Sequence, residues 1–405
     1  MTLGARSDSD SEISSIYPQD GQRPVYLDCN ATTPVDPRVA DEVLTYMAYE
    51  FGNAGSRTHE YGQVAKARVT QAREELASVV GCEPAEVLFT SGATESDNLA
   101  VLGLAATGER IGKKHIVATQ IEHKAVLEPL EALQRRGFDV TLVAPTGGGF
   151  VEPETIRDAL RPDTLLVSVM GVNNETGVIQ PIEAIAEVLQ EHEAYFHVDA
   201  AQAFGKIIEP LRSRRIDLIS VSGHKIFAPK GVGALVARRR RRHRVPLEPI
   251  MFGGGQERGL RPGTLPVALV AGLGTASALA LREHATRAER AAEIKRDALA
   301  ALDPLGIVLN GDKTRTVPHT LNFSVPGIDS EAALVALKDI VAISNGSACT
   351  SQSYDPSHVL VAAGLPRQQI DGALRLSWSH LTGEIPWNRI VERLGGIRRV
   401  ENLQI

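Results

Sequence analysis

Cysteine is scarce in this sequence. The 405 residues contain three cysteines, Cys29, Cys82 and Cys349, and these lie far apart. A structural zinc site or a redox pair needs closely spaced cysteines, and a disulfide framework uses an even number of them. The sequence therefore predicts neither a disulfide-stapled fold nor a metal site, and it favours a reducing, cytoplasmic setting.

Long apolar runs and a strong excess of one charge are also missing. The longest apolar stretch, 267–281, contains glycine, threonine and serine and ends before Arg282, so we expect no membrane span. With 43 basic and 49 acidic residues the net charge is −6, which is not the positive field of a dedicated nucleic-acid-binding protein. We therefore expect no direct binding to nucleic acid. Residues 1–24 are polar and rich in serine and aspartate, and they predict a disordered leader rather than a signal peptide.

Short β-branched runs alternate with helical patterns along most of the chain. This rhythm is typical of an α/β protein with a mostly parallel sheet covered by helices. A proline-free segment at 267–302 predicts a long helix, broken or kinked near Gly272 and Gly274, that connects a large domain to a smaller one. The expected strands of the large domain are 86–90, 115–119, 140–144, 164–170, 195–199, 217–221 and 233–237. In the last third we expect strands at 320–324 and 372–377 and helices at 330–338 and 387–394.

Lys225 stands in a Ser-Gly-His-Lys turn directly after an apolar strand. A lysine at the end of a buried strand can act as an amine nucleophile, because desolvation lowers its pKa and exposes the neutral amine. Asp199 ends another apolar strand, and a carboxylate there can keep a pyridinium nitrogen protonated. Together the two residues suggest pyridoxal phosphate. Taken alone, Lys225 is better interpreted as an ordinary surface lysine in a glycine turn.

The segment EVLFTSGATESDNLA predicts a strand, a Ser-Gly turn and the start of a helix. The backbone amides around Ala93 and the hydroxyl of Thr94 could meet a phosphate at the positive end of that helix. A simple helix cap, with Asp97 three residues further on, is the alternative. His123 follows another strand and could stack on a flat cofactor ring and move protons. The alternative for His123 is a purely structural role.

Cys349 lies in the polar stretch SNGSACTSQSYDPS, which has no helix or strand period. An accessible thiolate there could attack a substrate held elsewhere, and the alternative is a passive loop cysteine. Cys29 and Cys82 have no clustered partner, and we expect them to be structural. The five arginines at 238–242 could bind an acidic partner or nucleic acid, but a solvated basic strand end is the favoured interpretation.

Taken in order, these segments resemble a cysteine desulfurase of the NifS/IscS type, a fold-type I pyridoxal-phosphate enzyme of the class V aminotransferase family. YLDCNATT and GNAGSRTHE are most similar to the desulfurases associated with DNA phosphorothioation, the DndA-like branch. SNGSACTS resembles the longer-loop group of the family. The matching stretches cover most of residues 25–380 and are YLDCNATTPVDPRV, FGNAGSRTHEYG, LFTSGATESDN, IEHKAVLEP, VNNETGVIQPI, HVDAAQAFGK, SGHKIFAPKG, GGGQERGLRPGTLP and SNGSACTS.

The resemblance implies a role for each matching residue. Lys225 would bind the cofactor aldehyde, Asp199 would pair with the pyridine nitrogen, and Cys349 would be the nucleophile. Lys225 and His123 would move protons. The other implied cofactor ligands are Gln202 at the ring hydroxyl, His123 on the ring face, and Ala93, Thr94, Ser222, His224 and Thr264 of the partner subunit at the phosphate. Asn174 and Arg375 would hold the substrate carboxylate, Arg375 as a bidentate donor.

The activity implied by the resemblance is that of a homodimer which converts L-cysteine to L-alanine. It would form a persulfide on Cys349 and pass the sulfur to an acceptor protein, for DNA phosphorothioation, iron-sulfur cluster assembly or tRNA thiolation. Another fold-type I enzyme, an aminotransferase or a selenocysteine lyase, is one alternative, and a non-catalytic scaffold is another. The expected large domain spans 35–283, and the expected small domain comprises 25–34 and 284–405.

Overall fold

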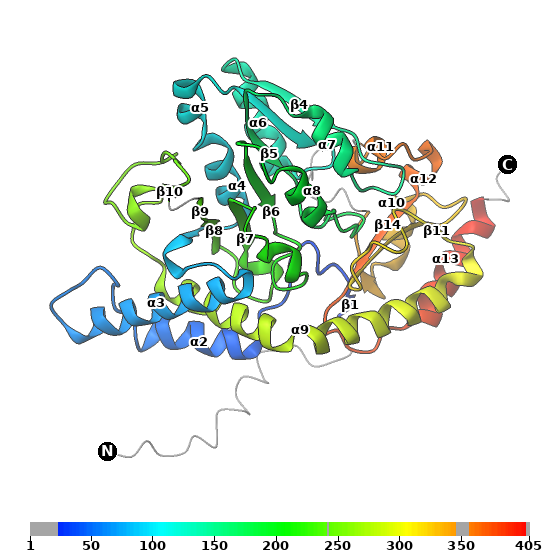
Figure 1. Ribbon diagram of the computed structural model, residues 1–405. Helices are drawn as coiled ribbons and strands as arrows, with labels where there is room; N and C mark the ends of the chain where they lie inside the picture. The colour runs from blue at the N-terminus through cyan, green and yellow to red at the C-terminus, as the bar shows by residue number, and fades with distance from the viewer. Residues whose placement is uncertain (1–22, 241–242, 346–355, 402–405) are drawn as a thin grey trace.

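A seven-stranded sheet forms the centre of the molecule (Figure 1). The computed structural model describes residues 23–240, 243–345 and 356–401. In sheet order the strands are β2 (Val87–Thr90), β8 (Gly233–Ala237), β7 (Leu218–Ser222), β6 (Tyr195–Asp199), β5 (Thr164–Ser168), β3 (His115–Thr119) and β4 (Asp139–Val143). From β7 to β4 all pairs are parallel, whereas β8 pairs antiparallel with β7 and with β2. The expected α/β class with a mostly parallel sheet is therefore confirmed, as are the seven strands to within two residues at each end.

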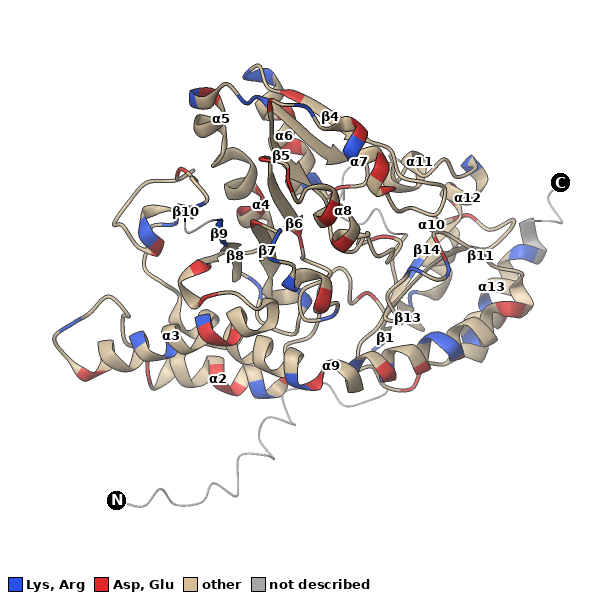
Figure 2. Cartoon of the chain, in the orientation of Figure 1, with Lys and Arg blue, Asp and Glu red and all other residues tan. Residues whose placement is uncertain are grey.

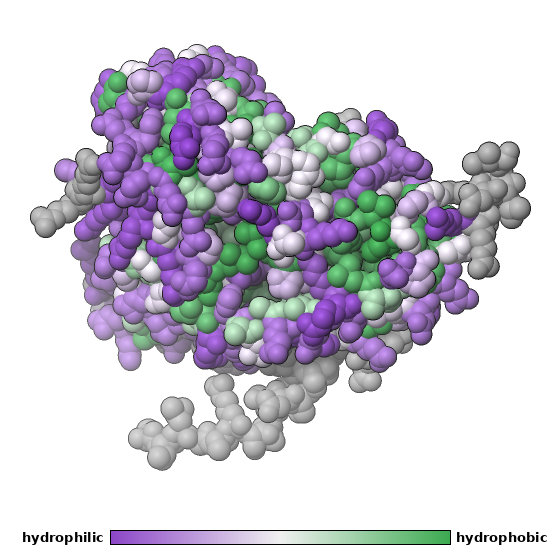
Figure 3. Space-filling model, turned by 45° about the vertical axis from the view of Figure 1, so that its right-hand side comes forward, coloured by the Kyte–Doolittle hydropathy of each residue, from purple (hydrophilic) through white to green (hydrophobic). Residues whose placement is uncertain are grey.

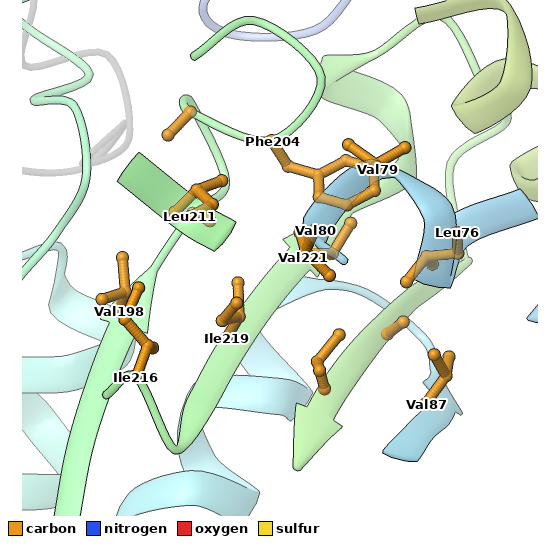
Figure 4. Close-up of a cluster of buried hydrophobic side chains, with 14 of the residues drawn as sticks. Leu76, Val79, Val80, Val87, Val198, Phe204, Leu211, Ile216, Ile219 and Val221 are labelled. Atoms are coloured by element: carbon orange, nitrogen blue, oxygen red, sulfur yellow. The ribbon is translucent and has the colours of Figure 1, made fainter. Parts of the chain in front are cut away.

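Helices cover both faces of this sheet, and successive side chains of a strand are buried on opposite faces. In β7, Ile219 and Val221 pack into one core, while Leu218 packs into the other. The first core lies against α3 (Glu60–Val80) and the first half of α9 (Val267–Leu302), and Figure 4 shows its side chains between α3, β6 and β7. The second core contains residues of α4 (Ala93–Leu102), α5 (Ala105–Ile111) and α6 (Lys124–Arg135). Burial on both faces explains why the central strands of the sheet are largely apolar.

Among the remaining helices, α2 (Pro37–Ala48) and α13 (Trp387–Glu401) are longer than the others. Asp36 caps α2, because its side chain accepts a hydrogen bond from the backbone N–H of Arg38 at 3.0 Å, and such caps stabilise a helix start. The helices not yet given are α7 (Pro153–Ala159), α8 (Ile182–Val188), α10 (Ser330–Leu337), α11 (His358–Ala362) and α12 (Arg367–Asp371).

Helix α9 is continuous from Val267 to Leu302, so the break expected near Gly272 and Gly274 is wrong. The two glycines instead allow close helix packing. A Cβ atom on Gly272 would lie 2.6 Å from Val43 of α2, and one on Gly274 would lie 2.7 Å from the Cα atom of Ala72 in α3. Both contacts are too short for any side chain, so glycine is required here for the approach of three helices.

A second body of structure lies around the C-terminal half of α9. It contains the antiparallel strands β11 (Val308–Leu309), β12 (Thr320–Ser324) and β14 (Ala373–Ser377), and the parallel pair β1 (Val25–Tyr26) and β13 (Val341–Ala342). Its core contains Leu27 together with residues of α9, α10, α13 and β14. Because Leu27 packs with C-terminal residues, we propose that 25–34 and 284–405 form a small domain and 35–283 a large one. The expected leader, 1–24, lies outside the described residues except for its last two positions.

Charged residues of both signs are interspersed along the outer helices, including α9 and α13 (Figure 2). On the face drawn in Figure 3, apolar surface is gathered in separate areas within a largely hydrophilic surround. Among the described residues, no helix combines the length and the apolar character that a membrane span requires.

The arginine run does not form a solvated strand end, and that expectation is wrong for Arg238. Arg238 is buried, and its guanidinium donates hydrogen bonds to the carbonyl oxygens of Val80, Leu211 and Ser213. Val80 is the last residue of α3, so Arg238 satisfies a carbonyl that the helix leaves unpaired. Arg240 donates to the carbonyl oxygen of His192 at 2.7 Å. Positions 241 and 242 lie outside the described residues.

Replacing Arg238 with methionine should lower the free energy of unfolding by about 2–4 kcal/mol, because charge-assisted bonds are lost and buried carbonyls remain unpaired. Urea unfolding followed by circular dichroism measures the change. Arg239 is exposed, so Arg239→Met is the control and should cost less than about 0.5 kcal/mol. Equal effects of the two substitutions would contradict the capping role of Arg238.

Candidate active site

A cavity of about 640 Å³ opens where the parallel strands end. Its walls come from the segments after β2, β3, β5, β6 and β7 and from β14 of the second body. Ligands of open α/β sheets bind at this edge, beyond the carboxyl ends of the strands. Ten of the residues expected in the site line this one cavity: Ala93, Thr94, His123, Asn174, Asp199, Gln202, Ser222, His224, Lys225 and Arg375.

Lys225 enters the cavity from the short helix η3 (Gly223–Lys225) that directly follows β7. Its Nζ atom donates hydrogen bonds to two backbone carbonyl oxygens, that of Asn30 and, at 2.7 Å, that of Ala31. The turn itself requires glycine, because a Cβ atom on Gly223 would lie 2.8 Å from the carbonyl oxygen of Val232. The Ser-Gly-His-Lys sequence therefore places the half-buried primary amine of Lys225 on the cavity wall. Lys225 is not an ordinary surface lysine.

Asp199 lines the same cavity from the end of β6. Its Oδ1 atom accepts a hydrogen bond from the N–H of Ala201 at 2.8 Å. Burial, together with the nearby carboxylate of Asp97, raises the pKa of Asp199 to about 6. Asp97 is itself buried, and neither of its carboxylate oxygens has a hydrogen-bond partner among the described residues. A cationic ring nitrogen bound beside Asp199 would offset this concentration of buried negative charge.

Helix α4 points its N-terminus into the cavity and has no side-chain cap. The alternative of a simple helix cap with Asp97 three residues further on is therefore wrong. Gly92 precedes the helix with φ +157°, and a Cβ atom on Gly233 would lie 2.6 Å from the Cα atom of Gly92. The first backbone N–H groups of a helix lack partners within it, and together with the helix dipole they attract anions.

The surroundings of this helix end are suited to a phosphate. Ser222 and His224 lie on the same cavity wall as Thr94. Burial, with Lys225, Lys230 and Lys206 nearby, lowers the pKa of His224 to about 4, so its imidazole is neutral at neutral pH. The Nδ1 atom of His224 lies 3.1 Å from the hydroxyl of Thr32.

His123 is the N-cap residue of α6, and its Nδ1 atom accepts a hydrogen bond from the N–H of Ala125 at 3.1 Å. The ring is thus oriented by the helix it begins, and the proton of the neutral imidazole lies on Nε2. Glu122, the preceding residue, is fully buried, and burial raises its pKa to about 8. Its Oε1 atom accepts from the Thr119 hydroxyl at 2.6 Å and from the N–H of Met170 at 2.9 Å. Glu122 therefore connects the ends of β3 and β5.

Arg375 reaches the cavity from β14. Its Nη2 atom donates to Asp28 at 2.6 Å, and its Nη1 atom donates to the backbone oxygen of Asn174 at 3.0 Å. Its buried Nε atom has no partner among the described residues. The guanidinium is thus held in place by two contacts and can still donate toward a bound anion.

Thr264 and Cys349 complete the set of expected site residues. Thr264, expected to act from the partner subunit, is exposed and does not line the cavity of its own chain, and Cys349 lies in 346–355, outside the described residues. The other two cysteines are poor nucleophiles, because burial raises the pKa of Cys29 to about 11 and that of Cys82 to about 12. Their thiols are therefore protonated at neutral pH.

Sequence reasoning missed three residues that organise the site: Asp28, Asn30 and Glu122. Asn30 is buried, and its side chain donates to Thr320 at 2.9 Å and to the Asn174 carbonyl at 3.0 Å. The motif YLDCNATT contains both Asp28 and Asn30, so the signal was present. Its partners lie far away in the sequence, and only the folded chain identifies them.

A family model described as aminotransferase class-V matches residues 25–382. The chain belongs to the aminotransferase class-V family. This class-V protein is 45% identical to cysteine desulfurase IscS of Vibrio cholerae over 372 residues, which are 91% of each chain. The crystal structure of DndA from Streptomyces lividans is 55% identical, with a TM-score of 0.77 over 87% of this chain and 99% of that one. The structure of SspA in complex with cysteine is 36% identical, with a TM-score of 0.77 over 87% and 98% of the two chains. The resemblance to the NifS/IscS desulfurases is thereby confirmed.

Pyridoxal phosphate is the cofactor of these class-V enzymes, and the residues of the cavity fit it. Lys225 supplies an amine for the aldehyde, Asp199 a buried carboxyl for the ring nitrogen, and the uncapped α4 a binding site for the phosphate. Each of the three groups of the cofactor thus meets a matching group of this chain.

Lys225→Ala should abolish covalent attachment of pyridoxal phosphate, because no other amine stands in this turn. Borohydride reduction followed by peptide mass spectrometry measures the attachment. Lys230, which lines the same cavity, is the matched control, and Lys230→Ala should keep the adduct on Lys225. Adduct at the wild-type level in the Lys225 variant, for instance on Lys206, would show that the assignment is wrong.

Proposed function

We propose that this protein is a pyridoxal-phosphate-dependent cysteine desulfurase, which converts L-cysteine to L-alanine and leaves a persulfide on Cys349. The observation that carries the proposal is the convergence of Lys225, Asp199, the α4 N-terminus and Arg375 on one cavity. The likeness to enzymes named cysteine desulfurase, at 45% identity over most of the chain, supports this activity above the other reactions of the fold.

The bound cofactor supplies an electron sink for the bond changes at the substrate carbon atoms. Asp199 keeps the ring nitrogen protonated, since its own pKa is raised by burial and by Asp97. Gln202 would hydrogen-bond the ring hydroxyl and His123 would stack on the ring, since both residues line the cavity. Lys225 takes up and returns the substrate proton once its amine is free. Ala93, Thr94, Ser222 and His224 bind the phosphate.

Arg375 and Asn174 bind the carboxylate of L-cysteine. Arg375 keeps its direction because Asp28 accepts a hydrogen bond from its Nη2 atom at 2.6 Å, and a fixed guanidinium loses less entropy on binding. The carboxylate thus anchors the substrate at the border between the two cores, with its amine and thiol free to react.

Arg375→Ala should raise the KM for L-cysteine by about 10- to 150-fold, because a charge-assisted carboxylate contact contributes about 1.5–3 kcal/mol. Initial rates of alanine formation across a range of L-cysteine concentrations measure it. Arg389→Ala, on the exposed side of α13, is the control and should leave KM unchanged. An unchanged KM in the Arg375 variant would mean that another group holds the carboxylate.

Sulfur transfer requires a nucleophile other than Lys225. The Cys349 thiolate attacks the sulfur of L-cysteine, the carbon–sulfur bond breaks, and the bonding electron pair passes to the substrate carbon, which is protonated to give L-alanine. The described residues on either side of 346–355 are anchored: Asn345 donates to Glu331 at 3.0 Å, and Ser357 donates to the buried Glu175 at 2.5 Å. The described residues that flank 346–355 are therefore held by side-chain hydrogen bonds.

Cys349→Ser should still bind pyridoxal phosphate and L-cysteine. It should release alanine at least about 100-fold more slowly than the wild type, because the serine hydroxyl is almost fully protonated at neutral pH. Alanine is quantified with a thiol reductant present, beside the visible spectrum. Cys29→Ser and Cys82→Ser are the controls and should keep near-normal rates. Loss of alanine only in the Cys29 variant would overturn the assignment, and a keto acid as product would favour the aminotransferase alternative.

The active unit is a homodimer in which Thr264 of the partner subunit completes the phosphate site. Several apolar side chains at the end of α2 and the start of α3 are exposed, and grouped apolar surface is typical of protein interfaces. They are Leu44, Met47, Tyr49, Phe51 and Tyr61, and the rings of Phe51 and Tyr61 stack with centroids 5.4 Å apart.

The sulfur on Cys349 passes to an acceptor protein, and a thiol that cycles in this way requires a reducing compartment such as the cytoplasm. The 55% identity to DndA favours DNA phosphorothioation as the pathway over iron-sulfur cluster assembly or tRNA thiolation. Capture of acceptors on the Cys349 persulfide form, followed by mass spectrometry, would identify the pathway.

A further inference from the structure

A second cavity, of about 520 Å³, lies between α9, the segment 205–212 and the end of β14. It shares no lining residue with the cavity that holds Lys225. Much of its wall is apolar, and cavities of this size with apolar walls and a few polar groups are typical of small-molecule sites. The apolar lining includes Ile207, Ile208, Phe227, Ala280, Leu281 and Trp378.

The polar groups on this wall are mostly donors and cations. Lys206, His284, His319, His380, Arg212 and Arg287 line the cavity, whereas Glu209 is the one acidic residue among those described there. Arg287 is already paired with Glu283, and Arg212 with Glu209. The cationic group that is available to a ligand is therefore Lys206.

Lys206 is short of partners. Among the described residues its Nζ atom has one hydrogen bond, to the amide oxygen of Gln202 at 3.3 Å, although an ammonium group has three donors. Burial and the nearby Lys225 lower the pKa of Lys206 to about 7. An anion in the cavity would stabilise the charged form and use the remaining donors.

His319 provides a second polar group without a partner. It is 9% exposed, and its Nε2 atom has no hydrogen-bond partner among the described residues. Burial, with Lys206 and Lys295 nearby, lowers its pKa far below the usual value, so the imidazole is neutral. Lys206 can supply one positive charge, and the neutral imidazole can contribute only a hydrogen bond, so the pair suits a singly charged carboxylate better than a dianionic phosphate.

We propose that this cavity binds a small organic carboxylate with an apolar body. The carboxylate lies beside Lys206 and His319, and the apolar body lies against Ile207, Phe227 and Trp378. The site is separate from the substrate site at Arg375 and does not depend on the desulfurase activity.

Isothermal titration calorimetry of the full-length holoenzyme with 3-phenylpropionate tests the proposal, with the neutral 3-phenylpropanamide as the matched probe. We expect one site per chain and an amide that binds at least about tenfold more weakly, because the charge-assisted contact is lost. Lys206→Met should weaken 3-phenylpropionate by a similar factor. Lys66→Met, on the exposed side of α3, should leave its Kd unchanged.

A second variant acts without touching Lys206. Ala288 lines the cavity from α9 and is only partly buried, so Ala288→Phe should fill the space and abolish probe binding while the thermal unfolding temperature stays near that of the wild type. Arg375→Ala should keep the probe affinity, since the two cavities are separate. Full affinity in both the Lys206 and Ala288 variants, or loss of binding in Arg375→Ala, would overturn the proposal. Calorimetric binding is read independently of alanine release, so failure here is distinguishable from failure of the proposed function.

Discussion

The backbone carbonyl of Asn30 is the point through which the parts of the site are held together. It accepts hydrogen bonds from Lys225 and, at 2.9 Å, from the amide of Gln202. The N–H of Asn30 donates to the Ser377 hydroxyl of β14 at 2.9 Å. One buried residue thus connects the amine of the large domain to a strand of the second core. Buried polar groups need such partners, and a fully satisfied network holds one arrangement.

Charged groups of both signs surround the cavity. Asp97 and Asp199 are buried carboxyl groups that line it, and burial raises the pKa of Asp199. Lys225, Lys230 and the N-terminus of α4 line it as well. A ligand with a cationic ring beside Asp199 and a phosphate at α4 would place opposite charges next to each other at both points, so binding of such a ligand would stabilise the folded protein.

The strands were predictable because burial on both faces makes them continuous apolar runs, and the chemistry at their ends was predictable because Lys225, Asp199 and Thr94 follow those runs directly. Long-range partners were not predictable in the same way. Arg238 continues an arginine run and was interpreted as solvated, but its carbonyl partners come from α3 and from 211–213. The glycines of α9 were interpreted as a break, since the sequence does not reveal which helix packs against them.

The alternation of β14 explains how a strand of the second core can serve the first cavity. Leu374, Leu376 and Trp378 point into the core of the second body. The residues between them take the other face, where Arg375 contacts Asp28 and Ser377 contacts Asn30. Successive side chains of a strand lie on opposite faces. The packing of Leu374 and Leu376 therefore also fixes the face of β14 on which Arg375 lies. Any shift of the strand by one residue would bury the guanidinium in the core and place a leucine in the cavity. The register of β14 is therefore as important for binding a carboxylate as Arg375 itself.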